Sequence, residues 1–380
     1  MRIVHILPEA ETFSRTRGGA LSRWAGCVLQ QSPLPRMVVS HDTDQSWENV
    51  PCLRTPRFVD AGRLIGRFRG APLWQVRRLL WMGCFAYLRP HLYCDDVLYV
   101  HNRPEMALAL AGLRWLWRLP LGVALHMHND HLAVAPAAVR KAVFANVDAM
   151  IFCSQFLRSQ AKVPATAEAR AHVLYNAADP SLFYPGSAPK PQPPVVLFVG
   201  RLWPEKGAHV FLEAMRLLWR DGCPAQARVV GAKWWNDDPT DPYLKSLRAQ
   251  VAGLEDRVSF AGFRTGMALA DEYRQATVFC CPSVWNEPFG MVNVEAMGCG
   301  IPVVAARAGG IPEIFGEGGG LLVPPNDPPA MAQAIQRLLT DKALADELGR
   351  QGRIAFERRF NWPHIAGQYT QLMQRLFSRA

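Results

Sequence analysis

Glu287 and Glu295 are two carboxylates that stand eight positions apart in the segment EPFGMVNVE. An apolar run at 278–283 precedes them and predicts a strand, while Pro288 suits the first turn of a helix that begins near it. Both carboxylates would then lie on roughly the same face of that helix. One could bind sugar hydroxyls and the other a ribose diol. An ordinary buried strand-to-helix corner would also account for the pair.

The start of this predicted helix also suits an anion. The amides of Phe289, Gly290 and Met291 would be unpaired donors at the positive end of the helix. The glycine would let the backbone approach a ligand closely. A diphosphate is an anion that such a helix terminus binds well.

A second candidate anion site lies upstream. The run VVLFV at 195–199, bounded by Pro194 and Gly200, predicts a buried parallel strand. The sequence then continues GRLWPEKG, which places Arg201 and Lys206 five residues apart in front of an amphipathic helix. Arginine can bind two phosphate oxygens at once, and lysine adds a mobile positive charge. The spacing differs from that of a Walker loop.

Together these motifs resemble the retaining glycosyltransferases of family 4, which have the GT-B fold, and among them the bacterial surface-polysaccharide and lipopolysaccharide glycosyltransferases. The resemblance covers residues 170–365 in the order of the family. The matching segments are 200–202 with 206–207, 258–263, 282–283, 287–304 and 309–313.

The resemblance implies that a hexose moves from a UDP- or GDP-sugar to a hydroxyl of a glycan or lipid-linked oligosaccharide, with its anomeric configuration retained. It also implies catalysis without a bound metal or other cofactor. Arg201 and Lys206 would stabilise the leaving diphosphate. The sequence offers no obvious carboxylate nucleophile for the other face of the sugar, unlike a retaining glycosidase, which fits a front-face mechanism in which the leaving phosphate takes the acceptor proton.

The same resemblance assigns further positions. Backbone groups around Gly262 and Phe263 are expected to receive the base, and a glycine-rich loop at 18–19 to lie beside the diphosphate. The expected catalytic residues are Glu287, His128, Arg201 and Lys206. The expected donor-binding residues are Gly19, Arg201, Lys206, Gly262, Phe263, Phe289, Gly290, Met291 and Glu295, with Gly18, His101 and His126 on the acceptor side.

The histidines also allow a second interpretation. His126 and His128 lie two positions apart at the end of a predicted strand, so their side chains share one face. With His101, His131 and Asp130 they could form a metal site. The resemblance implies no bound metal, and His128 is similar to the family's histidine that contacts the transferred sugar.

Alternating strand and helix patterns predict an α/β protein of the GT-B class, with two doubly wound parallel-sheet domains that face each other across a cleft. We expect an acceptor-binding domain at 1–185, a linker at 186–194, a donor-binding domain at 195–360, and a helix at 361–380 that packs back on the first domain. The strands expected in the second domain are 195–199, 227–231, 258–260, 278–281 and 302–305.

Composition narrows the class of protein. The 380 residues are 49% hydrophobic and contain no window of about 18 uncharged apolar residues, so no membrane span is expected. Nine scattered cysteines without a C-x2-C pair indicate reduced thiols in a cytoplasmic protein and no zinc site. The first seven residues suit a strand better than a signal peptide.

The positive charge is concentrated in the first half of the chain. Residues 1–190 hold 22 Lys and Arg against 13 Asp and Glu, and residues 53–83 hold seven arginines among Trp and Phe. Such a stretch predicts attachment to an anionic membrane surface at the inner face of the cell membrane. A helix with a solvated arginine face is the alternative. No nucleic-acid-binding module is present, so no nucleic-acid partner is expected.

Two other functions remain compatible with these motifs. One is an epimerase or phosphorylase that acts on sugar substrates within the same fold. The other is a protein that binds glycans or nucleotides without catalysis. Release of nucleoside diphosphate from a nucleotide sugar would distinguish these possibilities.

Overall fold

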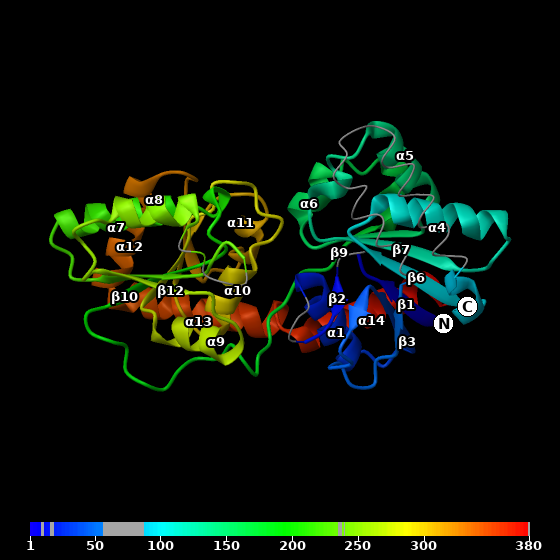
Figure 1. Cartoon of the computed structure of the whole chain (residues 1–380), viewed down its shortest axis with the longest axis horizontal. Helices are drawn as coiled ribbons and strands as arrows, with labels where there is room; N and C mark the ends of the chain where they lie inside the picture. Colours follow the sequence, from blue (N-terminus) through cyan, green and yellow to red (C-terminus); the bar gives the residue numbers. More distant parts are fainter. Residues whose placement is uncertain (9–10, 16–18, 56–86, 235–237, 239, 379–380) are drawn as a thin grey trace. The chain divides into compact units, whose positions relative to one another are not determined.

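The computed structural model describes residues 1–8, 11–15, 19–55, 87–234, 238 and 240–378. The chain forms two compact units, Met1–Asn176 with Trp362–Ala380 and Ala177–Asn361. Each is an α/β domain built on a parallel sheet, which confirms the predicted fold class (Figure 1). The segment predicted as a linker, 186–194, lies within the second unit.

The first unit has a seven-stranded parallel sheet in the order β5-β3-β1-β6-β7-β8-β9. Helices α1 and α14 cover one face of the sheet, and α4 and α5 cover the other (Figure 1). The strands are β1 Arg2–Ile6, β3 Arg36–Ser40, β5 Cys52–Arg54, β6 Asp96–His101, β7 Gly122–Met127, β8 Ala149–Phe152 and β9 Ala171–Val173, with β2 Thr12–Phe13 and β4 Asp42–Thr43 as a separate pair. The helices are α1 Ala20–Gln31, α4 Pro104–Leu116, α5 Ala137–Asn146, α6 Gln155–Gln160 and α14 Trp362–Phe377, with 3-10 turns η2 Arg89–His91, η3 Asp130–Leu132 and η4 Ala165–Arg170.

The second unit has a six-stranded parallel sheet in the order β12-β11-β10-β13-β14-β15. Helices α7, α8 and α12 cover one face, and α9 and α13 cover the other (Figure 1). The strands are β10 Val195–Val199, β11 Gln226–Val230, β12 Val258–Gly262, β13 Val278–Cys281, β14 Val303–Ala306 and β15 Gly320–Val323. The helices are η5 Pro204–Lys206, α7 Ala208–Arg220, α8 Pro242–Gln250, α9 Gly266–Gln275, α10 Met291–Gly298, α11 Ile311–Ile314, α12 Pro328–Thr340 and α13 Lys342–Arg359.

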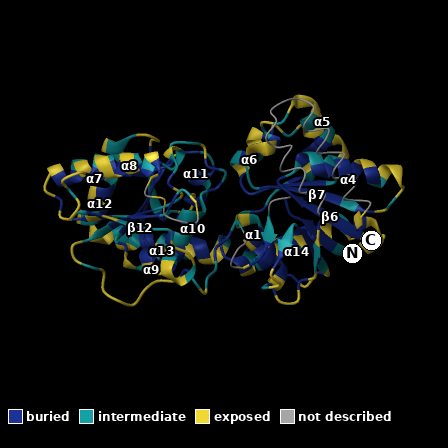
Figure 2. Cartoon of the chain, viewed as in Figure 1, coloured by how far each residue is buried: buried dark blue, intermediate teal, exposed yellow. Residues whose placement is uncertain are grey.

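The apolar runs of the sequence account for both sheets. β10 (VVLFV) and β13 (VFCC) carry apolar side chains at every position because helices cover both faces of a parallel sheet. The central strands of both sheets are buried (Figure 2). α14 buries Trp362, Ile365 and Tyr369 with their helical neighbours, and this one face packs against α1 within the first unit.

Candidate functional site

A buried ion pair links two neighbouring strands of the second sheet. β10 and β13 are paired, and the loops that follow their carboxyl ends bring Lys206 to Glu287. Lys206 Nζ donates to Glu287 Oε1 over 2.6 Å, and Ser283 Oγ donates to the same oxygen over 2.8 Å. Glu287 is only 7% exposed, so these two donors replace hydrogen bonds that its carboxylate would make to water. The sequence motifs placed both residues at the donor and did not indicate their direct contact.

The lysine is held at the carboxyl edge of the sheet by the local backbone. Lys206 is the last residue of η5, and Gly207 follows it with a φ of +76°. A Cβ on Gly207 would lie 2.1 Å from Pro282 O, so only glycine allows this close approach. Lys206 Nζ also makes a cation–π contact 5.0 Å from the centre of the Trp285 ring, which the sequence motifs did not indicate.

The helix that was predicted to begin near Pro288 begins at Met291. The prediction was wrong by three residues because Gly290 precedes the helix in a left-handed conformation, with a φ of +98°. Gly290 O accepts a hydrogen bond from Asn293 N, which closes the first turn. The Met291 amide keeps its place at the helix start, while the Phe289 side chain is buried against Phe360.

Glu295 lies in the second turn of α10 and receives a hydrogen bond from α9. Tyr273 Oη donates to Glu295 Oε2 over 2.8 Å, and the tyrosine is completely buried. Burial raises the pKa of Tyr273 well above its usual value, so it acts as a neutral donor. The sequence did not indicate this partner because it lies 22 positions away on another helix.

The remaining residues that the resemblance assigns to donor binding lie at the same edge of the second sheet. Arg201 follows β10 and its side chain is exposed. Gly262 ends β12 with a φ of +71°, and its carbonyl accepts from Gly231 N over 2.8 Å. Phe263 follows directly. Since ligands of parallel α/β sheets bind beyond the carboxyl ends of strands, these residues suit one ligand of this unit.

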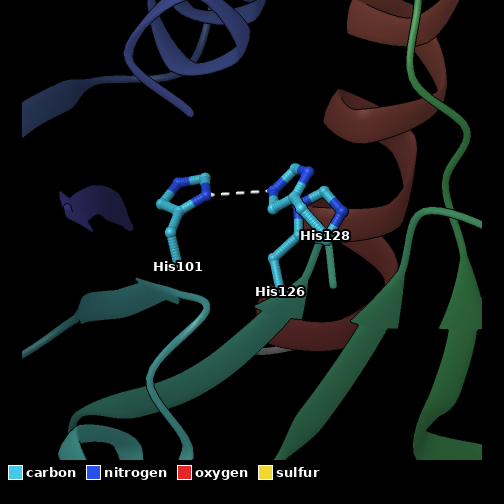
Figure 3. Close-up of side chains that lie close together, drawn as sticks. All are labelled: His101, His126 and His128. Atoms are coloured by element: carbon cyan, nitrogen blue, oxygen red, sulfur yellow. Dashed lines mark hydrogen bonds between the residues drawn. The ribbon is translucent and has the colours of Figure 1, made fainter. Parts of the chain in front are cut away.

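A cluster of histidines occupies the corresponding edge of the first sheet. His101 ends β6, and His126 is its register partner on the adjacent strand β7. His128 follows β7, and its Nε2 lies 3.3 Å from His101 Nδ1 (Figure 3). His131 is engaged elsewhere, because its Nδ1 contacts Asn102 O.

Further residues that the sequence did not indicate surround this cluster. His5 Nδ1 lies 3.0 Å from His101 Nε2, and His5 Nε2 lies 2.7 Å from Tyr369 Oη on α14. The Trp24 ring meets the His126 ring edge-on at 4.7 Å. These partners come from β1, α1 and α14, which lie far from the histidine motifs in the sequence.

Burial governs the protonation of the cluster. It lowers the pKa of His5 and of His128 to about 3. It also holds the pKa of His101 and of His126 well below the usual range, with smaller effects from the other histidines. The rings are therefore neutral near pH 7 and can exchange hydrogen bonds with hydroxyls without adding positive charge.

The Glu11 side chain lies at the start of helix α1, and burial raises the pKa of its carboxyl group. Gly19 precedes α1, and the Glu11 carboxylate accepts a hydrogen bond from Ser22 N over 3.1 Å. A Cβ on Gly19 would lie 2.7 Å from Glu11 Oε1. The Glu11 side chain therefore lies directly beside Gly19, the glycine that the resemblance places next to a diphosphate. Two predicted features, Gly18 and the arginine-rich segment from 56 to 83, lie outside the described residues. None of the helices that the structure describes is long and apolar enough to cross a membrane.

Comparison with known proteins identifies the family of this chain. The family described as "Glycosyl transferases group 1" matches residues 184–355. The chain is 31% identical to a D-inositol 3-phosphate glycosyltransferase of Corynebacterium glutamicum, over 76% of this chain and 74% of that protein. The chain belongs to the group 1 glycosyltransferases.

Other relatives of this glycosyltransferase agree with the family. It is 30% identical to the putative glycosyltransferase YtcC of Bacillus subtilis, over 66% of this chain and 67% of that one. Its fold matches sucrose-phosphate synthase from Thermosynechococcus elongatus with a TM-score of 0.75 and 25% identity, over 99% of both chains. It also matches Anabaena HepE, solved with UDP and glucose, with a TM-score of 0.72 and 22% identity, over 98% of this chain and 99% of that one. The architecture is therefore GT-B.

Proposed function

We propose that this glycosyltransferase moves a hexose from a UDP- or GDP-sugar to a hydroxyl of a glycan or lipid-linked oligosaccharide, with the anomeric configuration retained. The Lys206–Glu287 pair is the observation that carries the proposal. It sets a cation and a sugar-binding carboxylate side by side at the carboxyl edge of a parallel sheet. The solved relative with UDP supports testing uridine donors first.

The proposed reaction needs charge stabilisation more than acid–base chemistry. The bond between the anomeric carbon and the leaving phosphate oxygen breaks, and a bond from the acceptor oxygen to the same carbon forms. Lys206, Arg201 and the amides at the start of α10 would stabilise the negative charge that develops on the diphosphate. The leaving phosphate oxygen takes the acceptor proton, so the protein supplies no base and needs no metal.

The two carboxylates would bind different parts of the donor. Glu287 would accept hydrogen bonds from sugar hydroxyls, because the loop after β13 places it beside Lys206. Glu295, in the second turn of α10 and hydrogen-bonded by Tyr273, would bind the ribose diol. On the first unit, neutral His128 would contact the transferred sugar, with His101 and His126 beside it on the acceptor side.

We place the reaction in bacterial cell-surface polysaccharide biosynthesis, at the inner face of the cell membrane. The excess of Lys and Arg in residues 1–190 supports an anionic surface as the partner. A lipid-linked acceptor would lie at such a surface.

The first experiment identifies the donor. A panel of UDP- and GDP-sugars is incubated with the protein, and release of nucleoside diphosphate is followed with water as the acceptor. One donor should be hydrolysed, and it should raise the melting temperature because it binds the folded state. The exposed helical variant Lys245→Ala is the control and should keep the wild-type rate. Absence of binding and of hydrolysis across the whole panel would contradict the proposal.

A further inference from the structure

We propose that His101, His126 and His128, named here the histidine trio, bind one divalent transition-metal ion such as Zn²⁺. Each of the three offers one ring nitrogen, and these nitrogens lie within 4.8 Å of one another. Figure 3 shows the rings together at the carboxyl ends of β6 and β7. Imidazole nitrogen is a ligand that suits zinc, copper and nickel, and three histidines form a known zinc ligand set.

The second nitrogen of every ring in the trio already has a partner. Histidines that ligate a metal almost always hydrogen-bond through their other ring nitrogen, which fixes the ring and its tautomer. The contacts are His101 Nε2 with His5 Nδ1 at 3.0 Å, His126 Nδ1 with Tyr99 Oη at 3.0 Å, and His128 Nδ1 with Asn176 Oδ1 at 3.3 Å. The trio therefore has the supporting contacts of a ligand set as well as the ligands.

The nitrogens that remain are placed to share an ion. His101 Nδ1 and His128 Nε2 are 3.3 Å apart. Two ligands of a tetrahedral ion with Zn–N bonds of 2.0–2.1 Å lie about 3.4 Å apart. His126 Nε2 is completely buried and has no hydrogen-bond partner within the described part of the chain. Buried polar atoms without a partner are rare, and a metal bond would satisfy this one.

The hydrogen-bond chain can accommodate the ion without any histidine gaining or losing a proton overall. Without metal, a hydrogen bond between His101 Nδ1 and His128 Nε2 requires one proton on one of these two nitrogens. When the ion binds both nitrogens, His101 carries its proton on Nε2 and donates to His5 Nδ1. His5 then carries its own proton on Nε2 and donates to Tyr369 Oη. Each histidine stays neutral throughout.

Occupancy of the trio has a consequence for the reaction, and this consequence rests on the proposed function. His128 would contact the transferred sugar, and an ion bound to its Nε2 would remove that contact. We therefore expect Zn²⁺ to inhibit transfer and a chelator to restore it. The ion would act as an inhibitor, while the reaction itself runs without metal.

Metal binding is tested without any nucleotide sugar. Untagged full-length protein is treated with a chelator, dialysed and titrated with Co²⁺, and binding is followed by calorimetry and by the visible absorption of tetrahedral cobalt. We expect one ion per chain in the wild type and at least a tenfold loss of affinity in His126→Gln. The matched control His91→Gln changes an exposed histidine of η2 and should bind like the wild type.

Near-ultraviolet circular dichroism establishes whether His126→Gln is folded, and His128→Gln replaces it if it is not. Failure of the wild type to bind Co²⁺, or equal binding by the wild type and both trio variants, would overturn the proposal whatever the transfer activity. Cobalt binding by a protein that hydrolyses no nucleotide sugar would uphold the metal site and count against the proposed function.

Discussion

Lys206 and Glu287 share one short hydrogen bond, so neither side chain can be altered without changing the surroundings of the other. Lys206→Ala removes the cation that would stabilise the leaving diphosphate, and Arg201→Ala removes a second one. We expect each change to lower turnover by about a hundredfold, the loss seen when one pre-aligned electrostatic donor is removed. Rates of nucleoside diphosphate release measure this, with Lys245→Ala as the control. Near-wild-type rates in folded Lys206→Ala and Arg201→Ala would refute the donor assignment.

The two carboxylates should differ in which kinetic quantity they change. Glu295→Gln should mainly weaken nucleotide binding, because its hydrogen bonds to ribose persist in the ground and transition states. Glu287→Gln should lower turnover more than nucleotide affinity, since we propose that Glu287 binds the transferred sugar. Calorimetry with the free nucleoside diphosphate and turnover measurements separate the effects. Equal loss of nucleotide affinity in both variants would contradict this division.

At the scale of single elements, Gly207 determines how closely η5 and the end of β13 approach. Gly207→Ala introduces a Cβ that lies 2.1 Å from Pro282 O, in addition to a left-handed φ of +76°. The left-handed strain alone costs roughly 1–2 kcal/mol, and the clash should make the loss of unfolding free energy larger. Gly222→Ala is the matched control, with a φ of +83° and no atom within 4 Å of the added Cβ. Denaturant unfolding measures the loss of unfolding free energy in both variants. An equal loss in Gly207→Ala and Gly222→Ala would show that the contact with Pro282 O does not destabilise the variant.

The local pattern of apolar residues predicted most strands of the second sheet to within a few residues, but it did not predict which side chains contact one another. The strands at 195–199 and 278–281 were predicted with the bounds that the structure shows, and 227–231 is shifted by one residue. The apolar runs determine these strands because both faces are covered. The start of α10 was wrong because Gly290 adopts a left-handed φ, which an apolar pattern does not reveal.

Local sequence patterns did not predict the contact between Lys206 and Glu287 or the partners of the histidine cluster. Lys206 and Glu287 are 81 positions apart, and His5 and Tyr369 are 364 positions apart. The order of the strands in each sheet brings these residues together, and the local periodicity of the sequence does not predict that order. The resemblance to a family placed Lys206, Glu287 and His128 in functional roles, while their partners became visible only in the folded chain.

For the whole molecule, the uneven distribution of charge predicts attachment to an anionic membrane surface. The excess of Lys and Arg in residues 1–190 should draw the protein to vesicles that contain anionic lipid and much less to neutral vesicles. Salt near 1 M shortens the screening length to about 3 Å, so binding should be largely released there. Co-sedimentation measures this, and replacing Arg63, Arg67 and Arg69 together by Gln should lower vesicle binding while donor hydrolysis continues. Failure to bind anionic vesicles at low salt would favour a soluble acceptor.

The measurement that tests the central claim most directly is the anomeric configuration of the first sugar released. A donor with an α-linked sugar is hydrolysed in an NMR tube, and the anomeric proton is recorded before mutarotation. We predict that the α-anomer appears first, in the presence of EDTA, at a rate that falls about a hundredfold in Lys206→Ala. Initial release of the β-anomer, or a rate indifferent to Lys206, would contradict retaining transfer at the Lys206–Glu287 pair.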